Sequence, residues 1–345
     1  MAKQYVVWLK IAVILAVFYV LSQVTPIYLP IILAIILSFI LTPPVESLCC
    51  LRLWPASRHL PRGLAVAMVI LAAAIAFAVT VGFVFSPFVR EFNNFVFNLP
   101  ALIERIQAIT GAIGEKAQAL ELPANVQTVV DRMLAGAASY AVQVGQRALV
   151  STVNFASKIV ELVVVPVLTY YFLKDWRRLK ESLLTALPPA SRPKGAVIVE
   201  EMATVMSGYI RGQVLVSIIM GLLAFAGMYF LEVEYPLVLG LLAALTEAIP
   251  IIGPIIGAAP AVFLAYLGSP ALAVKVAVFF LIIHQLENHV VVPKVMGRSI
   301  DLHPVSVIIS LLIGGQLMGI VGMILAVPTA ALLKVLYKHL WVYDS

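Results

Sequence analysis

The chain has 345 residues, of which 62% are hydrophobic and only 12% are charged. Because soluble domains carry about 25% charged residues, this composition excludes a soluble globular protein and indicates a membrane protein. The net charge of +6 does not indicate nucleic-acid binding, because the basic residues lie at the ends of apolar segments, as they do in the cytoplasmic loops of membrane proteins. We therefore expect the lipid bilayer, and no nucleic acid, as a partner.

The N-terminal region, residues 1–86, contains three apolar segments, each long enough to cross a bilayer, which takes about 20 residues. They lie at about 5–23, 27–48 and 63–86. The first is not followed by a small-residue cleavage site, so we interpret it as a retained span. The adjacent Cys49 and Cys50 indicate neither a disulfide framework nor a metal site, because vicinal cysteines rarely bridge and no second cluster is present.

Residues 87–150 are less apolar, and their acidic and basic residues balance, which predicts an extracytoplasmic segment. Hydrophobic residues recur there at spacings of three and four, as at Leu102, Ile106 and Ile109, and again over 126–144. This spacing predicts amphipathic helices with heptad-like stripes. The helices would pack on each other or on the bundle, or alternatively form the contact of a homo-oligomer.

Residues 151–207 begin with a fourth predicted span at 152–173, which is followed by the basic sequence LKDWRRLK. Lysine and arginine gather in cytoplasmic loops, so this sequence predicts a cytoplasmic loop. The same rule places the N-terminus and the C-terminal tail, residues 337–345, in the cytoplasm.

The region 208–336 contains two ordinary spans, at 208–231 and 272–292, and two longer apolar stretches, at 236–267 and 304–336. As one straight helix, each long stretch would be about 50 Å long, which is much longer than the hydrocarbon core is thick, at about 30 Å. Each is also broken in the middle by glycine or proline. We therefore predict two re-entrant helical hairpins beside about six full spans in an all-α polytopic protein. The charges that follow each segment predict that the hairpins enter from opposite faces.

The two halves of this region, 208–267 and 272–336, indicate an inverted repeat. A shift of 68 positions aligns Pro236 with Pro304 and Pro260 with Pro328. Each half consists of one span followed by one broken hairpin, with opposite predicted orientations. In secondary transporters built this way, the broken segments meet near the midplane and form the substrate site.

Ionisable groups inside a membrane are costly and therefore indicate functional sites. Thr246 and Glu247 precede the break at Pro250, although a structural cap on the broken helix is the alternative interpretation of Glu247. Gln316 lies at the expected tip of the second hairpin.

The sequence HQLENH ends the apolar run 271–283. On a helix, His284, Glu287 and Asn288 would share one face, with Gln285 beside them. Alternatively, these residues only mark the membrane interface. The sequence is not the zinc-protease motif HExxH, because its two histidines are five residues apart. We expect no enzyme activity, no catalytic residue, no cofactor and no metal.

Several stretches follow one another along the chain: VPVLTYYFLKDW, YIRGQVLVSIIMG, AIPIIGPIIGAAPAV and the segment 285–336. Together they resemble the autoinducer-2 exporter family of bacterial inner-membrane permeases over nearly the whole chain. The resemblance implies a multi-pass transporter in the bacterial inner membrane. Members of this family are described as exporters of a furanone-type quorum signal or as sodium(lithium)/proton antiporters.

The resemblance implies that a set of residues in this chain corresponds to the family's motif. Glu247 is not among them. These are Gln213, Pro250, Gly253, Pro254, Glu287, Asn288, Pro293, Gly297, His303, Pro304, Gly315, Gly319, Gly322 and Pro328. We hypothesise a secondary transporter that exports a small polar metabolite, with Glu247 or Glu287 carrying a coupled proton or cation. A sodium(lithium)/proton antiporter and a non-transporting membrane scaffold are the alternatives.

Overall fold

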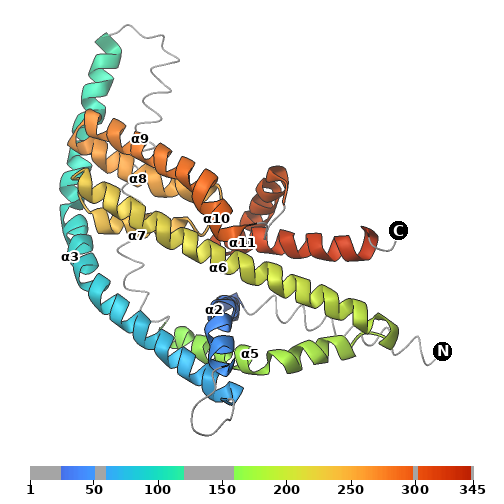
Figure 1. Ribbon diagram of the computed structural model, residues 1–345. Coiled ribbons are helices and arrows are strands. Elements are labelled where there is room, and N and C mark those ends of the chain that lie inside the picture. The colour runs from blue at the N-terminus through green and yellow to red at the C-terminus, as the bar shows by residue number, and fades with distance from the viewer. Residues whose placement is uncertain (1–24, 51–59, 120–158, 298–301, 343–345) are drawn as a thin grey trace. The chain divides into compact units, whose positions relative to one another are not determined.

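The computed structural model describes residues 25–50, 60–119, 159–297 and 302–342, and these residues form helices and no strand (Figure 1). The helices of the first half are α2 (Thr25–Cys50), α3 (Arg62–Ala119) and α5 (Ile159–Thr185). The second half contains η2 (Pro189–Ser191), α6 (Arg192–Phe230), α7 (Pro236–Thr246), α8 (Ile252–Gly268), α9 (Pro270–Leu286), η3 (Glu287–Val291), α10 (Val292–Met296), α11 (Pro304–Tyr337) and η4 (Lys338–Val342).

Five helical stretches in the described part of the chain are long and apolar enough to cross a membrane. They are Leu29–Cys50, Arg62–Asn98, Pro189–Phe230, Pro270–Met296 and Pro304–Leu340. This agrees with a helical multi-pass protein. The first predicted span and the start of the fourth lie outside the described residues, as do the predicted stripe over 126–144 and the end of the chain.

The chain divides into two compact units, of which the first is formed by Met1–Ala74 and Ser157–Glu200. In this unit α2 packs against α5. Val45, Val66 and Leu173 are among its buried core residues. The side chain of Arg62 donates a hydrogen bond from Nε to the carbonyl of Leu173 at 2.9 Å, which ties the start of α3 to α5.

The second unit, Ile75–Ala156 and Glu201–Ser345, contains the residues in which we predicted the transport site. Here α8 packs against both α7 and α9, and the buried core also includes residues of α6 (Figure 1). Small residues bring α6 and α7 into close contact, because a Cβ atom on Gly221 would lie only 3.1 Å from the carbonyl oxygen of Gly240. Met220, Met228 and Val276 are fully buried in this core.

The stretch 236–267 forms two helices, α7 and α8, that run back along each other. The chain reverses between Thr246 and Ile252, and Ile251 has a φ of 68° in this turn. A Cβ atom on Gly253 would lie 2.0 Å from the carbonyl oxygen of Thr246, and one on Gly257 would lie 3.1 Å from the Cα of Ala243. The two glycines therefore let the helices approach with no side chain between them.

The stretch 304–336 also reverses direction, inside α11. Met318 and Gly319 leave the helical conformation, with a φ of 61° at Gly319. A Cβ atom on Gly322 would lie 1.9 Å from the carbonyl oxygen of Gly314, so the two halves of α11 touch through their backbones. Both long apolar stretches thus change direction near glycines in their middle.

The turn between α7 and α8 packs against the middle of α11. Ile249 is buried in a cluster with Leu311 and Ala326, which belong to the two halves of α11. The two broken stretches, which are far apart in the sequence, therefore meet in the second unit.

Two groups of polar contacts hold the ends of these helices. Glu91 of α3 accepts hydrogen bonds from the backbone N–H groups of Leu237 and Val238 at 3.0 and 3.3 Å, and so satisfies donors in the first turn of α7. At the other end of the unit, Glu201 of α6 binds Lys338 and His339, with nitrogen–oxygen distances of 3.1 and 2.5 Å.

Some boundaries differ from the sequence prediction. The basic stretch after residue 173, which we expected as a loop, is helical, because α5 continues to Thr185 and α6 already begins at Arg192. The third span does not end near residue 86 but continues as α3 to Ala119. A helix can leave the apolar layer without ending, because its hydrogen bonds are internal; hydropathy alone therefore does not mark its end.

Candidate functional site

Glu247 is the first residue after α7 and lies in the turn that joins α7 to α8. Its side chain is buried, with 3% exposed. The amide Nε2 of Gln213 in α6 donates a hydrogen bond to the backbone carbonyl of Glu247 at 2.6 Å. Because α7 ends here, this carbonyl has no partner in a following helical turn, and Gln213 supplies one. This hydrogen bond ties the turn that carries Glu247 to α6.

Glu287 follows α9 and begins the π-helical segment η3. It is 7% exposed, and its Oε2 atom has no hydrogen-bond partner. A buried polar atom without a partner is rare in native structures and requires an explanation. Single π-turns inside α-helices also occur often at functional sites. Glu287 therefore combines two independent marks of a functional residue.

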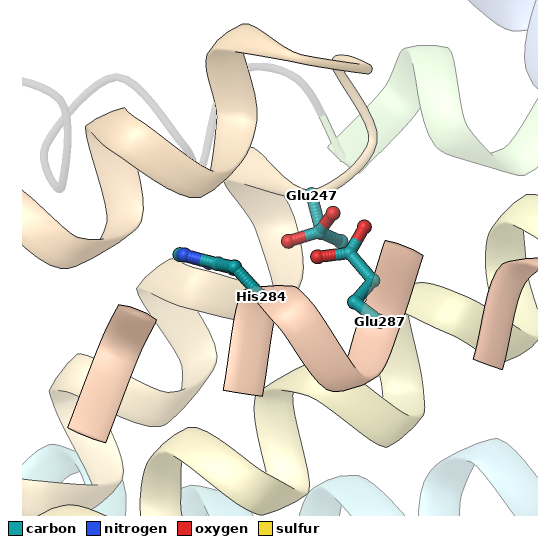
Figure 2. A group of neighbouring side chains, drawn as sticks. All are labelled: Glu247, His284 and Glu287. Atoms are coloured by element: carbon teal, nitrogen blue, oxygen red, sulfur yellow. The ribbon is translucent and has the colours of Figure 1, made fainter. Parts of the chain in front are cut away.

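Glu247, Glu287 and His284 form one cluster. One potential ligand atom from each side chain lies within 4.8 Å of the others. Figure 2 shows the carboxylates of Glu247 and Glu287 facing each other, with His284 one turn earlier on the helix that carries Glu287. The cluster joins residues that are 40 positions apart in the sequence.

The surroundings of the cluster are mainly apolar. A cavity beside it is lined by Glu247 and His284 together with Met220, Ala224, Ala243, Gly253, Pro254, Gly257, Phe280 and Ile283, and none of these is a lysine or arginine. Two carboxylate charges at most 4.8 Å apart would repel each other by at least about 3.5 kcal/mol at an effective dielectric constant of about 20. Because no lysine or arginine lines the cavity, bound protons or cations are the simplest way to reduce this repulsion.

The remaining predicted residues of the first hairpin lie close to the cluster. Gly253 and Pro254 line the cavity. The Thr246 hydroxyl donates to carbonyls of its own helix, those of Leu242 and Ala243, and lies against Gly257 of α8. Pro250 is half-buried in the turn.

Other predicted site residues lie away from the cluster. Gln285 and Asn288 are exposed, although we expected them beside Glu287. Neighbouring residues on a helix point about 100° apart, so a rotation that buries Glu287 turns Asn288 outward. Gly315 is half-buried and Gln316 is exposed near the reversal of α11.

The other positions of the predicted motif lie at helix ends, turns and close helix contacts. Gln213 supports the turn at Glu247, as described above. The His303 side chain accepts a hydrogen bond from the Val305 N–H at the start of α11, where Pro304 is the first helical residue. Pro293 lies in the first turn of α10, and Gly297, with a φ of 57°, follows its last residue. Gly319 forms the reversal of α11, while Gly322 and Pro328 are buried within it.

His284 is the member of the cluster that we did not place in the predicted site. Its spacing of three from Glu287 put both residues on one helix face, and this was the only available signal. The packing of α9 against the α7–α8 hairpin, which brings His284 to Glu247, cannot be read from spacing within one helix.

Comparison with known proteins agrees with this architecture. The family model described as "AI-2E family transporter" matches residues 9–341. The chain belongs to the AI-2E transporter family. It is 30% identical over 327 residues to MT0215 of Mycobacterium tuberculosis, which is named as a transport protein; the match covers 93% of this chain and 85% of that protein. The family consists of transporters, which fits the expectation that the chain is not an enzyme.

Two further relatives of this AI-2E family member are matched over a shorter region. YrrI of Bacillus subtilis, also named as a transport protein, is 38% identical over 51% of this chain and 50% of its own length. A protein of Halobacillus andaensis that is named a sodium-lithium/proton antiporter is 30% identical over 50% of each chain. The chain thus spans about half the length of these two relatives.

Proposed function

We propose that this AI-2E family member is a cation-coupled secondary transporter in which Glu247 and Glu287 together bind the coupled proton or cation. One observation carries the proposal: two buried carboxylates face each other in a membrane protein, and Oε2 of Glu287 has no partner. A purely structural role explains this poorly, because burying a charge without a partner is unfavourable.

The backbone around the pair supports alternating access. Glu247 lies at a break between two helices, and the turn that carries it packs against the second broken stretch through Ile249. Discontinuous helices of this kind form the ion and substrate sites of many secondary transporters. We propose that 236–267 and 304–336 are re-entrant hairpins that enter from opposite faces of the bacterial inner membrane, as two halves of an inverted repeat, with both chain termini in the cytoplasm.

For the cargo, we propose a small polar metabolite that moves outward, such as the autoinducer-2 quorum signal. Support comes from the family to which the chain belongs. We also propose that the protein forms a homo-oligomer, which rests on the amphipathic pattern of 87–150.

Sodium(lithium)/proton exchange without an organic cargo is the second candidate. The carboxylate pair favours it specifically, because two acidic groups that share one site can hold either a proton or a metal cation and release one on binding the other. The name of the Halobacillus relative points the same way. A scaffold without transport is less well supported, because it has no need for a buried carboxylate pair.

Proteoliposomes that contain a pH-sensitive dye test both candidates. Addition of sodium or lithium should move protons, and the quorum signal should enter inside-out vesicles or leave right-side-out ones only if it is cargo. Glu287→Gln should abolish coupled proton movement, whereas Glu234→Gln, which removes an exposed carboxylate, should not. If neither ions nor the signal move, or if Glu287→Gln behaves like wild type, the proposed function is wrong.

A further inference from the structure

We propose that the cluster of Glu247, His284 and Glu287 binds a divalent transition-metal ion, of the class of Zn²⁺, Mn²⁺ or Co²⁺. This inference deepens the proposed function, on which its last step rests: the metal ion occupies the transport site and competes there with the coupled proton or sodium ion.

The positions of the ligand atoms allow coordination of one ion. Bonds from zinc to histidine nitrogen and carboxylate oxygen are about 2.0–2.2 Å long, so ligand atoms around one ion lie roughly 3 to 4.3 Å apart. The three candidate atoms lie within 4.8 Å of one another. Small rotations of side chains, without movement of the helices, would bring them into one coordination sphere.

The charge of the site favours a divalent ion. Two ionised carboxylates carry a charge of −2, and a divalent cation balances it completely. One sodium ion or one proton would leave a net negative charge in mainly apolar surroundings, which is costly. No lysine or arginine lines the cavity, so the lining offers no permanently charged side chain to balance that remaining charge.

The histidine determines which class of divalent ion fits. Sodium, magnesium and calcium prefer oxygen ligands, whereas imidazole nitrogen suits zinc and other transition metals. Sodium is coordinated by oxygen atoms, so the imidazole of His284 would not contribute to a sodium site. An independent feature also points to a ligand: Glu287 is more than nine-tenths buried, its Oε2 has no partner, and its carboxylate faces that of Glu247.

Cobalt(II) is a suitable probe, because its visible absorption reports the number and type of its ligands. The protein is purified through an affinity tag that contains no histidine, in a Cys49→Ser/Cys50→Ser background, because both cysteines are free thiols that would bind cobalt. We expect one Co²⁺ per chain and an increase in Tm on binding. His284→Gln and Glu287→Gln should each weaken binding at least tenfold.

His289→Gln is the matched control. His289 is exposed, and its Nδ1 atom lies 2.9 Å from the carbonyl of Gln285 in its own helix, so its loss should not affect cobalt affinity. If Glu287→Gln does not fold, His284→Gln carries the test, because this side chain is only partly buried. Absence of stoichiometric Co²⁺ binding, or binding that survives both site variants, overturns the inference.

A transport measurement separates this inference from the proposed function. In proteoliposomes, Co²⁺ should inhibit sodium-dependent proton movement in wild type and should inhibit the His284→Gln variant at least tenfold less strongly. If cobalt does not bind but sodium still moves protons through Glu287, the metal inference fails and the proposed function stands. If cobalt binds but no ion or signal is transported, the proposed function fails, and with it the competition step.

Discussion

Replacement of Gly253 by alanine should disturb the candidate site without changing any of its ligands. The new Cβ atom would lie 2.0 Å from the carbonyl oxygen of Thr246, whereas carbon and oxygen atoms normally keep about 3.4 Å apart. The start of α8 must therefore move away from the end of α7 by about 1.4 Å. Overpacking of this kind costs about 1–3 kcal/mol, which for a chain of 345 residues corresponds to a fall in Tm of roughly 1–4 °C.

The same displacement should impair transport more than it impairs folding. Glu247 directly follows Thr246, so the movement changes its distance from Glu287, and a misplacement of about 1 Å can reduce the rate of a positioned reaction by about 100-fold. We expect at least a tenfold loss of sodium-dependent proton movement in proteoliposomes that contain equal amounts of folded protein.

Gly268→Ala is the matched control, because it introduces the same methyl group at the other end of α8. Its Cβ atom would meet only Leu272, at an ordinary contact distance of 3.6 Å. Tm and transport are measured side by side for both variants and wild type. If Gly253→Ala matches Gly268→Ala in both measurements, the close contact between α7 and α8, and the reasoning built on it, is refuted.

Three further predictions concern the supports of the site, and each is measured as a change in Tm. Glu91→Gln should destabilise the protein by about 0.5–2 kcal/mol, because it weakens the cap on the first turn of α7. Glu104→Gln replaces an exposed glutamate of α3, the helix that also carries Glu91, and should have no such effect. Gly322→Ala should lower Tm, because its Cβ atom would overlap a carbonyl across the reversal of α11, whereas Gly82→Ala, with no atom within 4 Å, should leave it unchanged or raise it. Glu201→Gln should lower the free energy of unfolding by at most about 1 kcal/mol, since the ion pairs of Glu201 with Lys338 and His339 are partly exposed. Salt at about 1 M should reduce the difference in Tm between the variant and wild type. A difference that salt does not reduce would contradict an electrostatic origin.

Much of the fold could be predicted from the sequence, because membrane helices obey strong local rules. A helix that spans the bilayer must be apolar over about 20 residues, and this requirement leaves a direct trace in the composition. The reversals in 236–267 and 304–336 were also predictable. A stretch too long for one span that contains glycine and proline in its middle has few alternatives to folding back on itself. The ends of α3 and α5 and the start of α6 could not be predicted in this way. A helix that emerges into water keeps its internal hydrogen bonds, so it does not have to end where the apolar sequence ends.

Composition and patterning alone predict a helical membrane protein whose C-terminal half contains two interrupted stretches, and they single out Glu247 and Glu287 as residues that are costly to bury. That these two carboxylates face each other, that His284 lies beside them, and that Asn288 and Gln285 do not, follows from the packing of the helices. The physical reason is that periodicity defines which residues share a helix face, whereas the rotation of that face toward its neighbours depends on packing between helices. That packing is set here by the close contacts at glycines of α6, α7 and α8.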